Sequence, residues 1–86
     1  MAQIKKVYRL VCSGTADKSI RFADLQKLIL ALGFDLARIS GDHFIYTREG
    51  MEEIINIQPD KGDPSKAKSF QVRQLRRIIT KYSLEV

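Results

Sequence analysis

Apolar positions follow a helical period in three separate segments of the chain. Over residues 3–12, apolar side chains recur at helical spacing while three bases fall elsewhere on the helical wheel. Residues 22–32 repeat this pattern. Residues 69–82 repeat it again, with Ser69 as a candidate N-cap. We therefore expect three helices, the first of which ends at Gly14 in a left-handed cap.

Between the second and third helices, short apolar segments predict strands. They are residues 34–40, 43–47 and 53–58, and a glycine-containing turn separates each from the next. Tight turns between successive strands imply an antiparallel meander. The stretch 59–64 contains two prolines and a glycine, so we expect an exposed loop there. The order predicts an α+β fold with the helices on one face of a three-stranded sheet.

Length and composition indicate one small globular domain. The chain has 86 residues, of which 44% are hydrophobic and 29% charged. Cys12 is the single cysteine, which excludes a disulfide-stapled secreted protein. No stretch approaches the roughly 20 apolar residues of a membrane-spanning helix, and no signal peptide is visible. We therefore expect a cytoplasmic protein that does not bind membranes.

Basic residues concentrate in the last third of the chain. Residues 61–82 contain seven Lys and Arg against Asp63 alone, within a net charge of +5. Arg73, Arg77 and Lys81 recur every four residues on the expected C-terminal helix. Clustered bases are typical of proteins that bind phosphate backbones. A solvated helix face explains the same charges, so charge alone leaves both interpretations open.

His43 is the candidate for acid–base chemistry. One histidine and one cysteine cannot supply a Cys-His nucleophile pair with a third orienting group, a zinc site or a two-histidine nuclease. His43 follows Gly41 and Asp42 at the start of a strand, where its imidazole is suited to deprotonate an RNA 2′-hydroxyl. From position alone, a surface histidine without a task is the simpler interpretation. Adjacent strand residues point to opposite faces, which argues against direct contact between Asp42 and His43. If the turn brings the two side chains together, the carboxylate would favour the protonated imidazole.

Other candidate side chains flank this position or precede the last helix. Phe44 and Tyr46 alternate with His43 and are expected to pack in the core, not to stack on bases. Lys66 and Lys68 lie on the loop before the basic helix. They are candidates to hold phosphate, with simple solubilisation as the alternative.

Several ordered blocks of residues carry a family likeness. They are SGDHFIY at residues 40–46, EIINIQP at 53–59, KAK at 66–68 and QVRQLR at 71–76. Together with the helix that begins near Ile20-Arg21-Phe22, they resemble the HicA family of toxins from bacterial and archaeal toxin–antitoxin modules. The likeness covers roughly residues 13–84.

The resemblance implies a double-stranded-RNA-binding-domain-like fold. It also implies mRNA interferase activity with no known cofactor or metal, and neutralisation by a HicB-type antitoxin. The domain would span residues 1–86, with 1–18 as an N-terminal helical extension and 19–84 as the HicA-like core.

The family's functional histidine falls on His43, which follows Gly41 and Asp42. The family usually has a serine at the position of Asp42 and often a second histidine at that of Phe44. A carboxylate at this position would repel the scissile phosphate. The basic residues that would bind RNA are Lys66, Lys68, Arg73, Arg77 and Lys81.

The expected chemistry is in-line attack of a 2′-hydroxyl on the adjacent phosphate, with His43 as general base. The general acid is not identified. Two alternatives use the same fold, namely a non-catalytic RNA-binding module and a subunit whose basic face binds an acidic protein partner. A pure binding module would tolerate the loss of His43.

Overall fold

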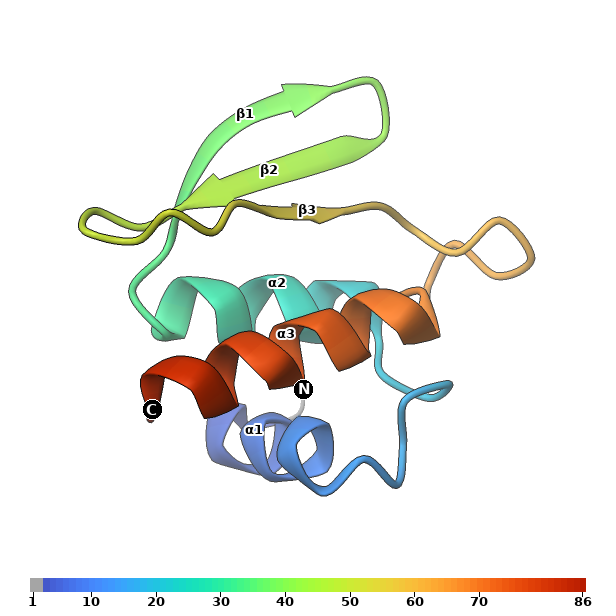
Figure 1. Ribbon diagram of the computed structural model, residues 1–86. Coiled ribbons are helices and arrows are strands. Elements are labelled where there is room, and N and C mark those ends of the chain that lie inside the picture. The colour runs from blue at the N-terminus through green and yellow to red at the C-terminus, as the bar shows by residue number, and fades with distance from the viewer. Residues whose placement is uncertain (1–2) are drawn as a thin grey trace.

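The computed structural model describes residues 3–86 and has the α+β architecture that the sequence predicts. The helices are α1 (Ile4–Ser13), α2 (Phe22–Ala31) and α3 (Ser69–Tyr82), and the strands are β1 (Asp35–Ser40), β2 (His43–Thr47) and β3 (Ile55–Ile57). The antiparallel sheet has the order β1-β2-β3, and the helices pack on one of its faces (Figure 1). Over residues 3–86, no helix is long and apolar enough to cross a lipid bilayer. Residues 1 and 2 of the expected N-terminal extension lie outside the described residues.

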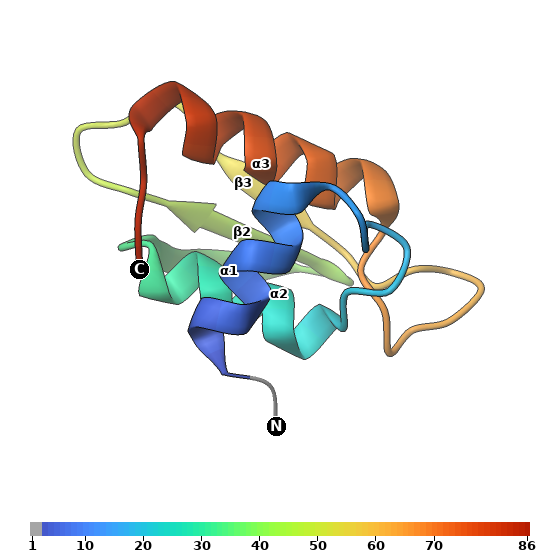
Figure 2. The ribbon, with the colours of Figure 1, turned by 90° about the horizontal axis from the view of Figure 1, so that it is seen from below.

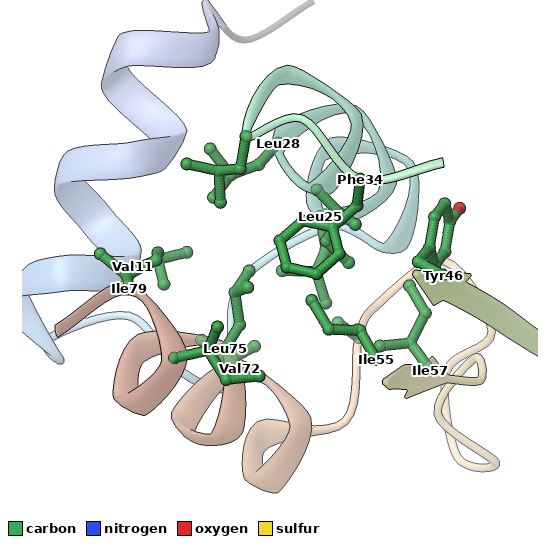
Figure 3. Packing of buried hydrophobic residues seen from close by; sticks show 14 of the residues in the cluster. Val11, Leu25, Leu28, Phe34, Tyr46, Ile55, Ile57, Val72, Leu75 and Ile79 are labelled. Atoms are coloured by element: carbon green, nitrogen blue, oxygen red, sulfur yellow. The ribbon is translucent and has the colours of Figure 1, made fainter. Parts of the chain in front are cut away.

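The hydrophobic core fills the space between the helices and one face of the sheet. Figure 3 shows side chains of α2, α3 and the strands meeting there around Phe34. α1 belongs to this core, because Val7 is 2% exposed and Val11 is fully buried, and it crosses beneath α2 and α3 (Figure 2). Burial of each such side chain stabilises the fold by about 1.5–3 kcal/mol. The largest fully buried side chains are Tyr46, Phe34, Leu25, Leu28, Ile29, Ile57, Leu75, Val11 and Val72.

An arginine of α3 ties the helices together. Arg76 donates from Nη1 and Nη2 to the two carboxylate oxygens of Asp17, at 2.9 and 3.0 Å, and from Nη1 to the carbonyl oxygen of Val11 at 3.0 Å. Gly14 ends α1 with φ 74°, and a Cβ at that position would lie 3.2 Å from the Arg76 guanidinium. The hydrogen bonds from Arg76 hold the pKa of the Asp17 carboxyl below its ordinary value. Glycine at position 14 therefore allows the left-handed conformation that ends α1, and it leaves room for the Arg76 guanidinium.

β3 is shorter than the sequence predicts, and contacts with α3 lie on both sides of it. Only Ile55–Ile57 pairs with β2. Before the strand, the Glu53 side chain turns to Lys81, whose Nζ lies 2.9 Å from its Oε2. After the strand, the backbone N–H of Gln58 donates to Oε1 of Gln71 at 3.1 Å. The apolar pattern of the sequence continues beyond both ends of β3, whereas the pairing with β2 stops there.

Two other boundaries also differ from the prediction. Ser69 is the first residue of α3 and not its N-cap; Lys68 holds that position, and no side chain caps the helix. The chain enters α3 directly from a β-bridge at Ala67, which fixes its path without a capping hydroxyl. Phe34 precedes β1, because its ring is buried in the core and its N–H bonds to the carbonyl oxygen of Ile29.

Asp17→Asn is expected to lower the free energy of unfolding at pH 7 by about 1–2 kcal/mol, because hydrogen bonds to a charged partner are lost. Since the pKa of Asp17 lies below 3.8 in the folded protein, this stabilisation is present above pH 3.8 and is lost as the pH falls through the folded-state pKa. Urea denaturation of parent and variant from pH 7 to pH 2.5 measures the difference, which should shrink below about pH 4. Glu52→Gln, at an exposed carboxylate, is the control. A difference that stays constant with pH would contradict the role given to this ion pair.

Candidate functional site

The β1–β2 hairpin presents His43 at the first position of β2. Ser40 and His43 pair across a two-residue turn formed by Gly41 and Asp42. Gly41 has φ 62° and Asp42 has a negative φ, which is the sign pattern of a type II′ turn with glycine at its first central position. A Cβ on Gly41 would meet no atom within 4 Å. The turn therefore needs this glycine for its backbone conformation and not for space.

Alternation along β2 separates the core from the candidate site. The ring of Phe44 meets that of Phe22 edge to face, with centroids 5.3 Å apart, and Tyr46 is 1% exposed. Both aromatic residues point toward the helices, so the prediction that they pack in the core is confirmed. His43 and Ile45 consequently point to the outer face of the sheet, which no helix covers (Figure 1).

Asn56 of β3 orients the imidazole. Its Oδ1 lies 3.1 Å from Nδ1 of His43. Asn56 pairs with Ile45, two residues from His43, so the two side chains are diagonal neighbours on the outer face. Because an amide oxygen can only accept, this hydrogen bond forms in the tautomer with a proton on Nδ1, and in the neutral form of that tautomer Nε2 keeps its lone pair. Nε2 is therefore the atom that can take a proton from a substrate.

Asp42 lies against the other side of the imidazole. Its Oδ1 is 3.7 Å from Nε2 of His43, and the side chains are 63% and 46% exposed. Strand alternation argued against this contact, but Asp42 belongs to the turn, which brings its side chain to the imidazole. The carboxylate pairs with the ring when the ring is protonated, and it repels anions that approach Nε2.

Arg38 is the cation that shares the outer face with His43. It pairs with Ile45 and is therefore the diagonal neighbour of His43 on the β1 side. A register shift between Leu36 and Arg38 puts Arg38 on this face. Within residues 3–86, no carboxylate forms a salt bridge with Arg38. Its guanidinium is thus available to an anion at His43.

The basic residues expected to hold RNA do not form one surface. The loop that precedes α3 lies at the end of the molecule that carries the β1–β2 turn, whereas α3 runs away from that end (Figure 1). Lys66 and Lys68 belong to the end of this loop. Arg73 and Lys81 lie eight positions apart, about 12 Å along the helix axis. Arg77 lines a pocket beside Glu53, at the opposite end.

Two of these bases lie beside acidic side chains. Lys81 pairs with Glu53, and hydrogen bonds from Tyr82 and Lys81 hold the pKa of the Glu53 carboxyl below its ordinary value. Nζ of Lys66 lies 4.0 Å from Oδ2 of Asp63. Lys68 has no such partner among the described residues. Its Nζ lies 6.0 Å from the centre of the Phe70 ring.

The sequence did not predict a role for three residues of the candidate surface. Arg38 and Asn56 gain their significance from strand register, for which the sequence gives no direct signal. Phe70 is 52% exposed on the first turn of α3. The sequence does indicate the exposure of Phe70, because this residue falls outside the apolar stripe of α3.

No cluster of three or more His, Cys, Asp and Glu side chains suited to a metal ion occurs within residues 3–86. In comparisons with known proteins, no family model, no curated protein and no solved structure matches the chain. The open sheet face around His43 is therefore the basis of the functional proposal.

Gly41→Ala is expected to destabilise the protein by about 1–2 kcal/mol and to disturb the His43 side chain, because alanine resists the positive φ of the turn. Gly50→Ala is a matched control at the far end of β2, with φ 83° and open space around its Cβ. Both variants should lose similar stability in urea denaturation. Only Gly41→Ala should change the imidazole signals in ¹H–¹⁵N NMR spectra. Equal changes in both variants would show that the turn does not position His43.

Proposed function

We propose that this protein is an endoribonuclease that cleaves mRNA and acts as the toxin of a HicA/HicB-type toxin–antitoxin pair. One observation carries the proposal: His43 is exposed on an open sheet face, with Nδ1 in contact with Asn56 and Nε2 turned away from it. The family likeness puts its functional histidine at this same position. The order α2-β1-β2-β3-α3, with both helices on one face, supports a double-stranded-RNA-binding-domain-like fold.

In the proposed reaction, Nε2 of His43 takes the proton from the RNA 2′-hydroxyl. The 2′-oxygen attacks the adjacent phosphorus in line with the leaving 5′-oxygen. The bond from phosphorus to the 5′-oxygen breaks, which leaves a 2′,3′-cyclic phosphate on one fragment and a 5′-hydroxyl on the other. The leaving oxygen takes its proton from water, from a lysine or from the imidazolium of His43.

Charges beside His43 act on the phosphate with opposite signs. Arg38, its diagonal neighbour, is positioned to stabilise the negative charge that develops on the phosphoryl oxygens. Asp42, 3.7 Å from Nε2, repels the same oxygens. The balance between these two side chains sets how easily the scissile phosphate reaches the base.

RNA beyond the cleavage point would be held through its backbone. Lys68 and Arg73 are exposed or partly exposed bases near the start of α3. Contacts of this kind position the RNA without reading its sequence. The aromatic residues of β2 both point into the core, so the outer sheet face gains no stacking platform from Phe44 or Tyr46. Recognition by backbone and shape follows from this arrangement.

RNA binding without cleavage is the second candidate function. One observation favours it, namely the exposed ring of Phe70 beside Lys68, since aromatic rings next to cations bind unpaired nucleotides by stacking. Such a module would not need His43. An acidic antitoxin would be expected to compete with RNA for the same bases in either case.

His43→Ala is expected to abolish growth arrest on expression and to lower the rate of RNA cleavage about 10²–10⁴-fold, because the general base is lost. RNA affinity and the urea midpoint should stay close to those of the parent, since the side chain is 46% exposed. Toxicity, cleavage, binding and unfolding are measured on the same preparations. A folded variant that remains as toxic as the parent would show that His43 is not the base.

Asn56→Ala provides a graded comparison, because it keeps the imidazole and removes the acceptor that orients it. Cleavage should fall, but less than in His43→Ala, with RNA affinity unchanged. An Asn56→Ala variant with full activity would mean that the hydrogen bond to Nδ1 has no part in the reaction.

Lys68→Gln is expected to weaken binding of unrelated RNAs by similar factors, whereas Lys81→Gln should have little effect. Lys81 is engaged by Glu53 and lies far from the hairpin end, while Lys68 has no acidic partner within residues 3–86. Loss of one phosphate contact should flatten the slope of log affinity against log salt by about 0.7–0.9. Fluorescence anisotropy at several salt concentrations measures both quantities. Equal losses in the two variants would mean that RNA runs along the whole of α3.

A further inference from the structure

β1 is exposed along its whole length. All six of its residues are exposed, and the strand rises away from the helices (Figure 1). Two of them are large and apolar, with Leu36 43% and Ile39 54% exposed. As an edge strand, β1 also presents unpaired peptide groups on the side away from β2. Proteins usually shorten, cover or charge such an edge, and an open apolar edge is a template for another strand.

A register shift puts the two apolar residues on the same face of the sheet. Leu36 pairs with Tyr46 and Ile39 with Phe44, and both of these aromatic residues point toward the helices. Residues three apart in a regular strand would point to opposite faces. The register shift between Leu36 and Arg38 changes this alternation, so that Leu36 and Ile39 point to the same face. The inner side of β1 therefore carries an apolar pair that no helix covers.

The charged residues of β1 share the other face. Asp35 pairs with Thr47 and Arg38 with Ile45, which both lie on the outer side of β2. These are the only charged residues of the strand, and they have opposite signs. The edge therefore has no net charge, although the whole chain carries +5.

We propose that the β1 strands of two copies of this chain pair antiparallel and form one continuous sheet through both copies. A two-fold axis between Ala37 and Arg38 puts Leu36 opposite the partner's Ile39. The same contact occurs a second time on the other side of the axis. Each apolar residue of the open inner side then gains an apolar cross-strand neighbour.

The charges fit the same register. Asp35 falls opposite the partner's Ser40, which makes it the diagonal neighbour of the partner's Arg38 on the outer face. Two Asp–Arg pairs then cross the axis. This self-complementarity identifies a second copy as the occupant of the edge. In the dimer both His43 side chains lie on the same side of the joined sheet, and each Arg38 lies between His43 of its own chain and the partner's Asp35.

Sedimentation equilibrium tests the proposal with the full chain. The parent should show a concentration-dependent dimer. Asp35→Arg and Arg38→Asp should each weaken dimerisation at least about tenfold, because each places like charges across the axis twice. The double variant Asp35→Arg/Arg38→Asp should restore it. An equimolar mixture of the two single variants should form a heterodimer, since one edge then carries two bases and the other two acids.

Two further variants separate this edge from other surfaces. Leu36→Gln should weaken the dimer without unfolding the chain, because Leu36 is already 43% exposed. Arg73→Asp makes the same change in charge on α3 and should leave the dimer intact. A monomeric parent, a dimer that survives Leu36→Gln, or single variants that do not associate when mixed would each overturn the proposal. RNA cleavage by Leu36→Gln, measured separately, depends on His43 and reports on the proposed function alone.

Discussion

Along β2, successive side chains point alternately to the helices and away from them, and both the core and the candidate site depend on this alternation. Tyr46 and Phe44 fill the space above α2 and fix the sheet against the helices. His43 and Ile45 are forced to the opposite face by the same geometry. A shift of one residue in the register of β2 would bury the imidazole and expose the two rings. The stability of the core therefore holds His43 on the open face.

A three-stranded sheet with one open face leaves little apolar surface to stabilise a chain of 86 residues. The helical layer compensates in two ways. α1 closes the underside of the core with Val7 and Val11. Arg76 then links α3 to the end of α1 and to Asp17 through its hydrogen bonds. One of the bases in the basic third of the chain is thus a structural residue, and its charge is not available to a polyanion.

Tertiary contacts also redistribute the remaining positive charge. Lys81 is held by Glu53 and Lys66 lies near Asp63, whereas Arg38 is added to the surface by strand register. The candidate site consequently has one charge of each sign beside His43, with Arg38 on one side and Asp42 on the other. If the protein binds RNA as proposed, this charge distribution favours phosphate contacts close to the hairpin over contacts spread along the basic helix.

The apolar periods of the sequence determined the three helices, the antiparallel meander, the turn at Gly41 and the inward direction of Phe44 and Tyr46, because these features depend on local spacing. The turns at Gly14 and Gly41 were also predictable locally, because both residues have a positive φ that favours glycine. Tertiary structure alone decided the ends of β3 and the N-terminus of α3. It also brought Asn56 and Arg38 to His43 across strand pairs. These contacts join residues that are distant in the chain or depend on the exact register of two strands. No pattern along a single segment contains that information.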